Sequence, residues 1–286
     1  MTNRHFGNVA DVWKHLVLCE VLTLSWPQRY AETHAGSAVY ALDGTGPEKE
    51  YGVRRFLAAA GASGPLAESA YAALVRPEVA RSAPAYPGSA LQAMRLLGES
   101  VDYLLCDTDP VSAAGLREWA ERLDRPGCRV EQRDGMTALE EWLGDDLRPT
   151  IVHIDPFDPM ARLDGGRSAL DVAGLVAEAG AGLVYWYGYD TPAERGWPLS
   201  RLGELTSSAL WCGDVLVTDG TGATRSDGNL GDATTPGTGF GIVLANVTTD
   251  THVACAGLGE ALMTAYDGVP LPSGEAGRLA VEVIAS

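Results

Sequence analysis

The segment Asp155-Pro156-Phe157-Asp158 places two carboxylates and an aromatic ring directly after the apolar run 150–154. Carboxylates in such a cluster can bind an amine and accept its proton, which is the chemistry of a general base. A purely local alternative is that Asp155 and Pro156 form a turn that ends a strand. The choice between the two depends on the elements that surround the segment.

Apolar runs of strand length alternate with segments of helical periodicity along residues 1–190. This alternation predicts an α/β fold with a mostly parallel, doubly wound sheet and helices on both faces. In such sheets ligands bind outside the carboxyl ends of the strands, which is where Asp155 stands. We expect a single domain over 1–286, with a helical insertion at 44–85 that covers the site.

The individual elements follow from periodicity and from turn residues. Helices are predicted over 10–24, 51–60, 65–74, 90–97, 112–123, 136–143 and 169–179, and strands over 101–106, 129–133, 150–155, 183–187, 209–217 and 239–247. Ser89 ends a predicted turn and is expected to cap the helix 90–97. The Gly- and Thr-rich stretch 219–238 predicts a hairpin connection or a mobile flap.

Asp107 follows the strand 101–106, which is the second strand of the predicted nucleotide-binding unit. An acidic residue at that place commonly accepts the hydroxyls of a ribose. Its structural alternative is the N-cap of the helix 112–123, a role that Asp109 can also fill. Upstream, a short strand ends in small residues, and Gly36 among them lets the backbone approach a ligand closely.

The bulk composition excludes several classes of protein. The chain has 286 residues, 46% of them hydrophobic, and a net charge of −17, which repels phosphate backbones at long range. Its five cysteines show neither a C-x-x-C pair nor a zinc spacing, so no metal site and no disulfide framework is predicted. Without a signal peptide or a membrane-spanning apolar run, we expect a cytoplasmic protein.

Several motifs occur in a fixed order along about residues 5–250. They are Gly7-Asn8-Val9-Ala10-Asp11-Val12-Trp13-Lys14-His15, Thr33-His34-Ala35-Gly36, Tyr86-Pro87-Gly88-Ser89, Asp134-Gly135, Asp155-Pro156 and the similar end segment Gly237-Thr238-Gly239-Phe240-Gly241. Together they resemble the bacterial 23S ribosomal RNA adenine-N6 methyltransferase family called RlmJ. The part least like that family is the insertion at 44–85.

The resemblance implies a Rossmann-like class I methyltransferase fold that binds S-adenosylmethionine. The cofactor-binding residues predicted on this basis are Lys14, His15, His34, Gly36, Ser89, Asp107, Asp134 and Gly135. Asp107 falls on the family position for a ribose-binding acid, in agreement with its place at a strand end. Asp155 falls on the first residue of the family's Asp-Pro-Pro-Tyr motif, so the predicted catalytic residues are Asp155, Pro156 and Asp158.

The motif departs from the family pattern at its last two positions, Phe157 and Asp158. In the family motif the acid and the proline carbonyl orient an aromatic amine, and the tyrosine stacks on the flipped base. Here Asp158 stands in place of that ring and suits a cationic or aminated group better. The predicted substrate residues are Phe157, which can supply a ring, and Tyr185 and Tyr187, which can stabilise a cation or simply pack in the sheet.

Three functions remain open at this stage. The first is S-adenosylmethionine-dependent transfer to an amine of a small molecule, including a cyclisation of the cofactor itself that releases methylthioadenosine. The second is the family activity on ribosomal RNA, for which a basic patch would come from Arg4, Arg54, Arg55, Arg76 and Arg81. The third is a binding protein that keeps the pocket. Charge and the altered motif favour a small molecule over RNA, and the acceptor and the oligomeric state are not predicted.

Overall fold

The computed structural model describes residues 6–42, 44, 46–61, 63–144, 146–158, 166–224 and 233–285. Its strands are β1 (Arg29–Glu32), β2 (Val39–Ala41), β3 (Ala85–Pro87), β4 (Asp102–Cys106), β5 (Cys128–Glu131), β6 (Thr150–Ile154), β7 (Gly182–Tyr189), β8 (Leu210–Asp219), β9 (Gly239–Ala245), β10 (Val269–Pro270) and β11 (Ala276–Ala285). Its helices are α1 (Val9–Ser25), α2 (Pro47–Lys49), η1 (Glu50–Arg54), α3 (Arg55–Ala60), α4 (Pro65–Glu68), α5 (Ala70–Val79), α6 (Ser89–Leu97), α7 (Pro110–Arg122), α8 (Gly135–Leu143), α9 (Ala169–Glu178), η2 (Pro192–Glu194), α10 (Trp197–Leu205) and α11 (Thr249–Tyr266).

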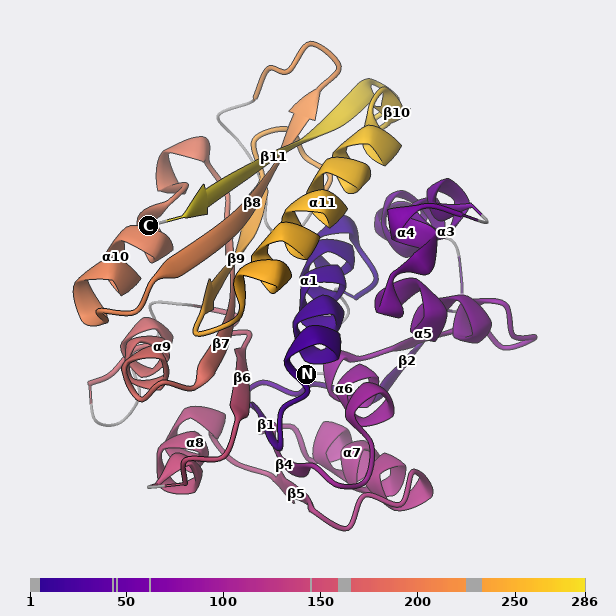
Figure 1. Cartoon of the computed structure of the whole chain (residues 1–286). Helices are drawn as coiled ribbons and strands as arrows, with labels where there is room; N and C mark the ends of the chain where they lie inside the picture. The colour runs from indigo at the N-terminus through magenta and orange to yellow at the C-terminus, as the bar shows by residue number, and fades with distance from the viewer. Residues whose placement is uncertain are drawn as a thin grey trace.

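A nine-stranded sheet in the order β10-β11-β8-β9-β7-β6-β1-β4-β5 runs through the molecule (Figure 1). The strands from β5 to β7 pair in parallel, and each pair from β7 onward to β10 is antiparallel. Among the described strands, only β9 and β11 therefore run against the others. The predicted fold class, a Rossmann-like α/β fold with a mostly parallel sheet, is confirmed.

Helices cover both faces of the sheet, because successive residues of each strand point to opposite sides. Tyr30 and Tyr103 pack into one core with α1, α6, α7 and α11, whereas Ala31 and Leu104 pack into the other with α8, α9 and α10. Figure 1 shows α1 beside α11, so the two ends of the chain share one layer.

The region 44–85 forms short helices and a second, two-stranded sheet of β2 and β3. The predicted helix 65–74 is wrong in one respect, because Ser69 divides it: its backbone is extended and its hydroxyl caps α5. At Gly52 a Cβ would lie 2.1 Å from the carbonyl oxygen of Gly7, and the Val53 amide donates to that oxygen at 2.9 Å. This region therefore packs backbone to backbone on the start of α1.

Two helix starts differ in how well the sequence predicted them. Asp109 is the N-cap of α7 and accepts the Ser112 amide at 2.9 Å, which leaves Asp107 free of that role. The prediction that Ser89 caps the next helix is wrong, because Gly88 occupies the cap position and Ser89 is the first helical residue. The reason is that the Ser89 hydroxyl points inward to a buried carboxylate, Glu32.

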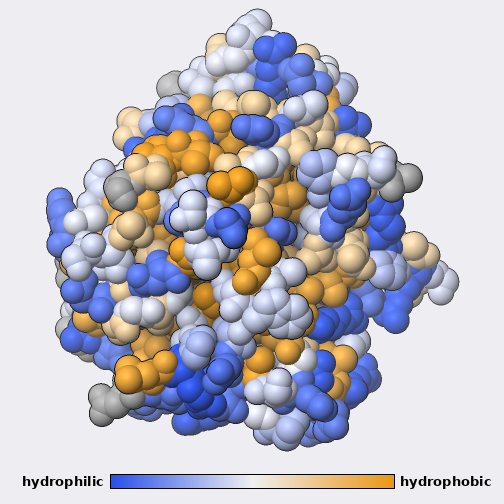
Figure 2. All heavy atoms as spheres, viewed as in Figure 1, coloured by the Kyte–Doolittle hydropathy of each residue, from blue (hydrophilic) through white to orange (hydrophobic). Residues whose placement is uncertain are grey.

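None of the helices in the described part of the chain is long and apolar enough to cross a membrane. On the face shown in Figure 2, hydrophilic residues surround smaller patches of hydrophobic ones. Of the stretch 219–238, residues 225–232 lie outside the described residues; the strands on either side, β8 and β9, pair as antiparallel neighbours.

Candidate functional site

The order of the parallel strands reverses between β1 and β6, which lie side by side with Glu32 opposite His153. Doubly wound sheets bind their ligands at such a reversal, outside the carboxyl ends of the strands. The segment after β1 begins at Thr33, whose amide donates to the His153 carbonyl at 3.2 Å. The segment after β6 begins at Asp155. The two stretches singled out in the sequence therefore flank one point of the sheet.

The loop after β1 crosses toward the end of β4. The Ala35 amide donates to the Cys106 carbonyl at 2.8 Å, and the Gly36 amide donates to the Asp107 carboxylate at the same distance. Gly36 has a φ of +59°, a conformation that favours glycine. Asp107 thus lies at this loop, as its strand-end position predicted, with its Oδ1 accepting the Asp109 amide at 2.8 Å.

The connection between β5 and α8 packs against the same loop after β1. A Cβ on Gly135 would lie 2.1 Å from the carbonyl oxygen of Thr33, so only glycine allows α8 to begin here. Asp134 caps that helix by accepting the Thr137 amide at 2.9 Å. Both residues therefore have a structural role beside the loop that carries His34.

Helix α1 brings two further predicted residues to the site. Asn8 caps it by accepting the Asp11 amide at 2.9 Å, and the Asp11 carboxylate in turn accepts the Gly7 amide at 2.7 Å. With its start fixed in this way, the helix buries Lys14 and His15 against the sheet.

We expect Asn8→Ala to lower the free energy of unfolding by about 1 kcal/mol, because the amide of Asp11 loses its acceptor. Asn8→Ser keeps an acceptor oxygen and should lie within a few tenths of a kcal/mol of the wild type. Urea denaturation measures both variants. Equal losses for alanine and serine would show that the cap contributes nothing.

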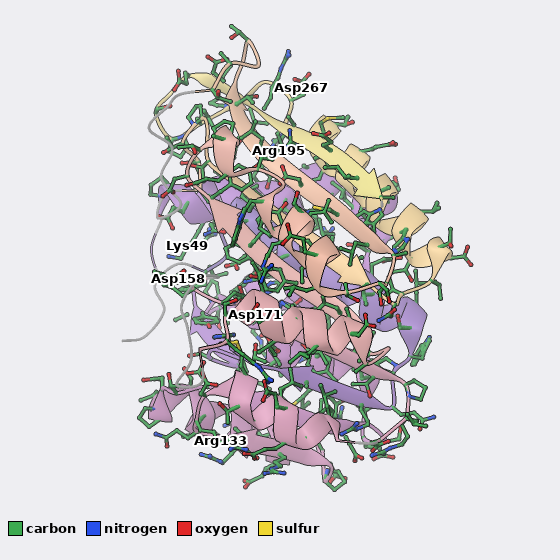
Figure 3. The ribbon with its side chains drawn as sticks, turned by 90° about the vertical axis from the view of Figure 1, so that its left-hand side faces the viewer. Lys49, Arg133, Asp158, Asp171, Arg195 and Asp267 are labelled. Carbon is green, nitrogen blue, oxygen red and sulfur yellow. The ribbon has the colours of Figure 1, made fainter. Side chains whose placement is uncertain are left out.

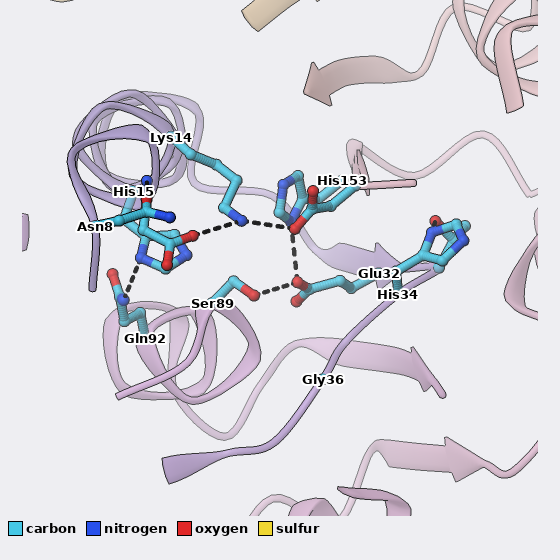
Figure 4. A network of polar contacts seen from close by, with 12 residues as sticks. Asn8, Lys14, His15, Glu32, His34, Gly36, Ser89, Gln92 and His153 are labelled. Carbon is cyan, nitrogen blue, oxygen red and sulfur yellow. Dashed lines mark hydrogen bonds and ion pairs between the residues drawn. The ribbon is translucent and has the colours of Figure 1, made fainter. Parts of the chain in front are cut away.

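Lys14 joins two carboxylates across the site (Figure 4). Its Nζ lies 2.9 Å from Asp11 Oδ1 and 2.7 Å from Asp155 Oδ2. Burial alone would lower the pKa of Lys14, but the two carboxylates raise it well above its usual value. Burial would likewise raise the pKa of Asp155, but Lys14 and the nearby His153 hold it below its usual value. Lys14 and Asp155 are therefore both charged at neutral pH.

His15 has its tautomer fixed by Gln92. The Gln92 amide nitrogen donates to the Pro87 carbonyl at 2.8 Å and lies 3.1 Å from His15 Nδ1. Because an amide nitrogen cannot accept, Nδ1 must be the acceptor and the ring proton lies on Nε2. Tyr86 Oη contacts the same Nδ1 at 2.6 Å. Burial lowers the pKa of His15, and the Lys14 charge lowers it further, so the ring is neutral.

Beneath these residues lies a buried carboxylate that the sequence analysis did not single out. Glu32 is 1% exposed and accepts the hydroxyl of Ser89 and, at 3.0 Å, that of Tyr30. His153 Nδ1 lies 3.0 Å from Glu32 Oε1, and its buried Nε2 has no hydrogen-bond partner in the described part of the chain. Figure 4 shows Ser89, Glu32 and His153 as one chain of contacts below Lys14.

A cavity of about 50 Å³ opens between these groups. It is lined by Phe6, Asp11, Lys14, His15, His34, Ala35, Gly36, Tyr40, Tyr86, Gly88, Ser89 and Asp155. Five of the eight predicted cofactor residues and the predicted catalytic Asp155 therefore share one cavity, while Asp107, Asp134 and Gly135 stand outside its lining. A larger cavity of about 240 Å³ between η1 and β10 contains none of the predicted cofactor-binding, catalytic or substrate residues.

The charges around the cavity determine whether it suits a cationic or an anionic ligand. Asp11 and Asp155 outnumber Lys14, and Asp107 adds a carboxylate behind Gly36. Burial lowers the pKa of His34, although the surrounding carboxylates oppose this, so that ring is neutral too. Such a wall favours a cationic group and disfavours the pyrophosphate of a dinucleotide.

The other predicted residues lie at different depths. Pro156 is buried, whereas Phe157 is 95% exposed and Asp158 is exposed near the left-hand margin of Figure 3. Tyr185 is fully buried, and no described residue forms a hydrogen bond with its hydroxyl. Burial raises its pKa, and the charges of Asp155 and Asp158 raise it further, which places this ring close to the motif.

Tyr187 belongs to a separate network on β7 and β8. Its hydroxyl donates to Asp214 at 2.8 Å, and that carboxylate also accepts from Tyr189 at 2.7 Å and from Arg195 at 2.6 Å. Its ring covers Gly241, where a Cβ would lie 2.5 Å from it. These contacts account for Tyr187 without a ligand.

The arginines expected to form a basic patch each have a local partner. Arg54 pairs with Glu50 at 3.1 Å and Arg81 with Glu78 at 2.6 Å. Arg55 and Arg76 donate to the backbone carbonyls of Ala265 and Gly61. Arg4 lies outside the described residues.

The described residues contain no group of three or more histidine, cysteine or acidic side chains that could hold a metal.

Sequence reasoning missed Asp11, Glu32, Gln92 and His153. Asp11 stands in the first motif of the resemblance without a predicted role, and Gln92 and His153 lie inside the predicted helix 90–97 and the predicted strand 150–155. A usable signal existed for Glu32 and His153, since each is a charged or polar residue within the last two positions of a buried parallel strand. Such strands are normally apolar throughout, so a polar residue there indicates a site.

Comparison with solved structures supports the fold. Protein LPL1258 from Legionella pneumophila, described as DUF519, is similar with a TM-score of 0.73 and 19% identity, over 97% of this chain and 98% of that one. At this identity the likeness shows a shared fold and no activity.

Two enzymes are more distantly similar. A precorrin-6Y C5,15-methyltransferase from Geobacter metallireducens has a TM-score of 0.38 and 11% identity over 81% of this chain and 86% of that one. An S-adenosylmethionine-dependent methyltransferase from Agrobacterium tumefaciens has a TM-score of 0.34 and 16% identity over 55% and 52%. Likenesses this weak establish nothing about this chain. No family model matches the sequence, and no curated protein is significantly similar to it.

Proposed function

We propose that the protein is an S-adenosylmethionine-dependent enzyme that transfers an alkyl group, in the simplest case methyl, to an amine of a small molecule. The observation that carries the proposal is the excess of carboxylates at the strand-order reversal, where Asp11 and Asp155 outnumber Lys14 and both histidines are neutral. A sulfonium is a cationic centre, which a cavity with an excess of negative charge binds favourably. Membership of the RNA methyltransferase family stays a prediction from the resemblance.

The residues present fit a sulfonium nucleoside in their chemistry. Asp107 lies where a ribose hydroxyl would be accepted, and Gly36 leaves backbone room beside it. Lys14 offers a cation to an amino-acid carboxylate. The cavity of about 50 Å³ is smaller than the roughly 300–1,000 Å³ of ligand sites, so binding must widen it. The rings of Phe6 and Tyr40 stack with their centroids 4.6 Å apart, and both residues are partly exposed. They form the side of the cavity that can move without exposing the hydrophobic core.

S-adenosylmethionine, when bound, supplies a carbon made electrophilic by the adjacent sulfonium. The protein's part is to hold an amine in line with that carbon, since alignment is the main source of rate in such transfers. Asp155 and the Pro156 carbonyl would accept the two N–H groups of the amine and turn its lone pair toward the carbon. We also propose that the region 44–85, which packs on the start of α1, covers this site.

The exposure of Phe157 favours a second substrate with a flat or apolar face. A ring that is 95% exposed directly after Pro156 can stack on an acceptor that enters from solvent. The same ring could stack on an adenine, and this observation keeps RNA methylation as the second candidate.

The small volume of the cavity favours instead the intramolecular variant, in which the amine of the cofactor attacks its own side chain.

Incubation of the pure protein with S-adenosylmethionine alone, followed by mass spectrometry, is the experiment that separates these reactions. We expect an unchanged cofactor alone and S-adenosylhomocysteine when a panel of small amines is added. Detection of methylthioadenosine together with a new amino acid would show that the reaction is cyclisation of the cofactor and not methyl transfer. Turnover only with unmodified ribosomal RNA would establish the second candidate, and binding without any turnover would indicate a binding protein.

We expect Asp155→Asn to reduce kcat roughly 10²–10⁴-fold, the usual range for a group that handles the reacting proton or its hydrogen bonds. Affinity for S-adenosylmethionine, measured by calorimetry, should fall by much less than kcat, because Asp11 still balances Lys14 and Asp107 remains beside Gly36. Asp109→Asn is the matched control, since asparagine caps α7 equally well. Full activity in the Asp155 variant would remove this residue from the mechanism.

A further inference from the structure

An amine nucleophile must lose a proton, and the obvious acceptor in the site is poorly suited to take it. The pKa of Asp155 lies below its usual value because Lys14 and His153 outweigh its burial. A carboxylate with a lowered pKa is a weak base at neutral pH. His15 is no better placed, because its Nδ1 already faces Gln92 and Tyr86.

We propose that Ser89 and Glu32 form the proton relay of the site, and that His153 is the positioning residue that holds Glu32 in place. This inference rests on the proposed function and names the route by which the amine is deprotonated. Ser89 is the connection between the two regions, because it lines the cavity and its hydroxyl donates to Glu32 Oε1.

Glu32 is a fully buried acceptor. Its side chain has no exposed surface, and among the described residues its partners are two hydroxyls and one imidazole, with no lysine or arginine within ion-pair distance. This distinguishes Glu32 from Asp155, whose charge Lys14 compensates.

His153 fixes the orientation of that acceptor. Its Nδ1 lies 3.0 Å from Glu32 Oε1, and since an ionised carboxylate can only accept, Nδ1 must be the donor. Among the described residues its Nε2 has no hydrogen-bond partner, although this atom is buried. Tyr30 holds the second oxygen, Oε2, so both oxygens of the carboxylate are directed.

The transfer balances without any further reactant. The amine N–H proton moves to Ser89 Oγ while the Ser89 hydroxyl proton moves to Glu32 Oε1. The nitrogen lone pair forms the new N–C bond, and the C–S bond breaks with its electrons on sulfur, which becomes a neutral thioether. Glu32 ends as a neutral carboxylic acid and later returns its proton to solvent through the same hydroxyl.

Other ionisable groups pack around the relay and would contribute to any pH profile. From α1 these are Lys14, His15 and Cys19; from β1 and the loop after it, Tyr30 and His34; from β4, Tyr103; and from the end of β6, Asp155. The test therefore includes variants that change the hydroxyl alone and leave all of these in place.

The kinetic test compares Ser89→Ala with Ser89→Thr in whichever transfer or cyclisation the protein catalyses. We expect Ser89→Ala to lower kcat roughly 10²–10⁴-fold, with KM for S-adenosylmethionine changed only a few-fold, and Ser89→Thr to recover most of the loss. Ser37→Ala is the control, because its hydroxyl contacts only Ser112, at 3.1 Å, among the described residues. Full turnover in Ser89→Ala would overturn the relay.

A second readout needs no turnover. In the free protein, nitrogen-15 NMR of the histidine rings should show a proton on Nδ1 of His153, and His153→Gln assigns the signal. A His153 ring with no proton on Nδ1 would overturn the relay, because Glu32 would then lack the donor that holds it in place. Failure of the proposed function is a different result: no binding of S-adenosylmethionine by calorimetry, whatever the state of His153.

Discussion

Replacement of Lys14 by methionine is expected to lower the free energy of unfolding by about 3–5 kcal/mol, the usual loss when one partner of a buried ion pair is removed. Lys14 is 8% exposed and lies within 3 Å of both Asp11 and Asp155. Methionine keeps most of the volume of the side chain, so the loss reports charge and not packing. Chemical denaturation at pH 7 measures it.

The chain offers a matched control, because it contains one other lysine, Lys49. Lys49 contacts the face of Phe6 at 4.5 Å, and Lys49→Met should cost less than about 1 kcal/mol. In the double variant Lys14→Met/Asp155→Asn part of the lost stability should return, since one of the two uncompensated charges is gone and only Asp11 remains. Equal effects of the two lysine variants would show that Lys14 is not a buried counterion.

The pH dependence of Lys14→Met should be reversed in sign. In the wild type the pKa of Asp155 is lowered, so its stabilisation is present above the unfolded value near ~4 and is lost as pH falls through the folded value. Without Lys14, burial alone acts and raises the pKa. The variant should then be least stable at neutral pH and should regain stability on acidification from pH 7 to pH 5.

Gly135→Ala is expected to cost about 3 kcal/mol or more, at the upper end of the range for overpacking. The new methyl group would lie 2.1 Å from the Thr33 carbonyl oxygen and 2.5 Å from its Cα, and both are backbone atoms that no rotamer change can move aside. The loop after β1 must shift, so affinity for S-adenosylmethionine should fall together with stability. Thermal denaturation and calorimetry measure the two effects.

Gly115 provides the control for this substitution. It lies inside α7, and a Cβ there meets no atom within 4 Å. Gly115→Ala should therefore raise stability by up to about 1 kcal/mol, because alanine is the better helix former. If both alanines stabilise the protein, α8 does not pack on the loop as described.

The strand-end positions of the site could be predicted from the sequence because they depend on local pattern. A mostly apolar run predicts the strand 150–155, and a parallel sheet places Asp155, at its end, at the ligand edge. The same reasoning placed Asp107 at a strand end, and the structure brings it to Gly36, 71 positions away in the sequence. Strand alternation also fixed the fold class without any knowledge of pairing.

Side-chain partners could not be predicted, because they depend on which elements pack on which. Nothing local to Lys14 indicates that it faces Asp155, 141 positions later. The pairing exists because α1 precedes β1 and crosses the sheet above β6. Likewise, Ser89 has the sequence context of a helix cap, and only the position of α6 over β1 directs its hydroxyl to Glu32 instead.

Trp13 connects the first helix to the last third of the chain. Its indole nitrogen donates to the Gly213 carbonyl at 3.0 Å across 200 positions, and a Cβ on Gly213 would lie 2.7 Å from the same ring. At ribosomal rates of about 5–20 residues per second, Gly213 is synthesised roughly 10–40 s after Trp13. During that interval α1 can pack on α5 and α6, which are made earlier, but not on β8 or on α11. A nascent chain that stops before β8 therefore leaves the ring of Trp13 without the Gly213 carbonyl.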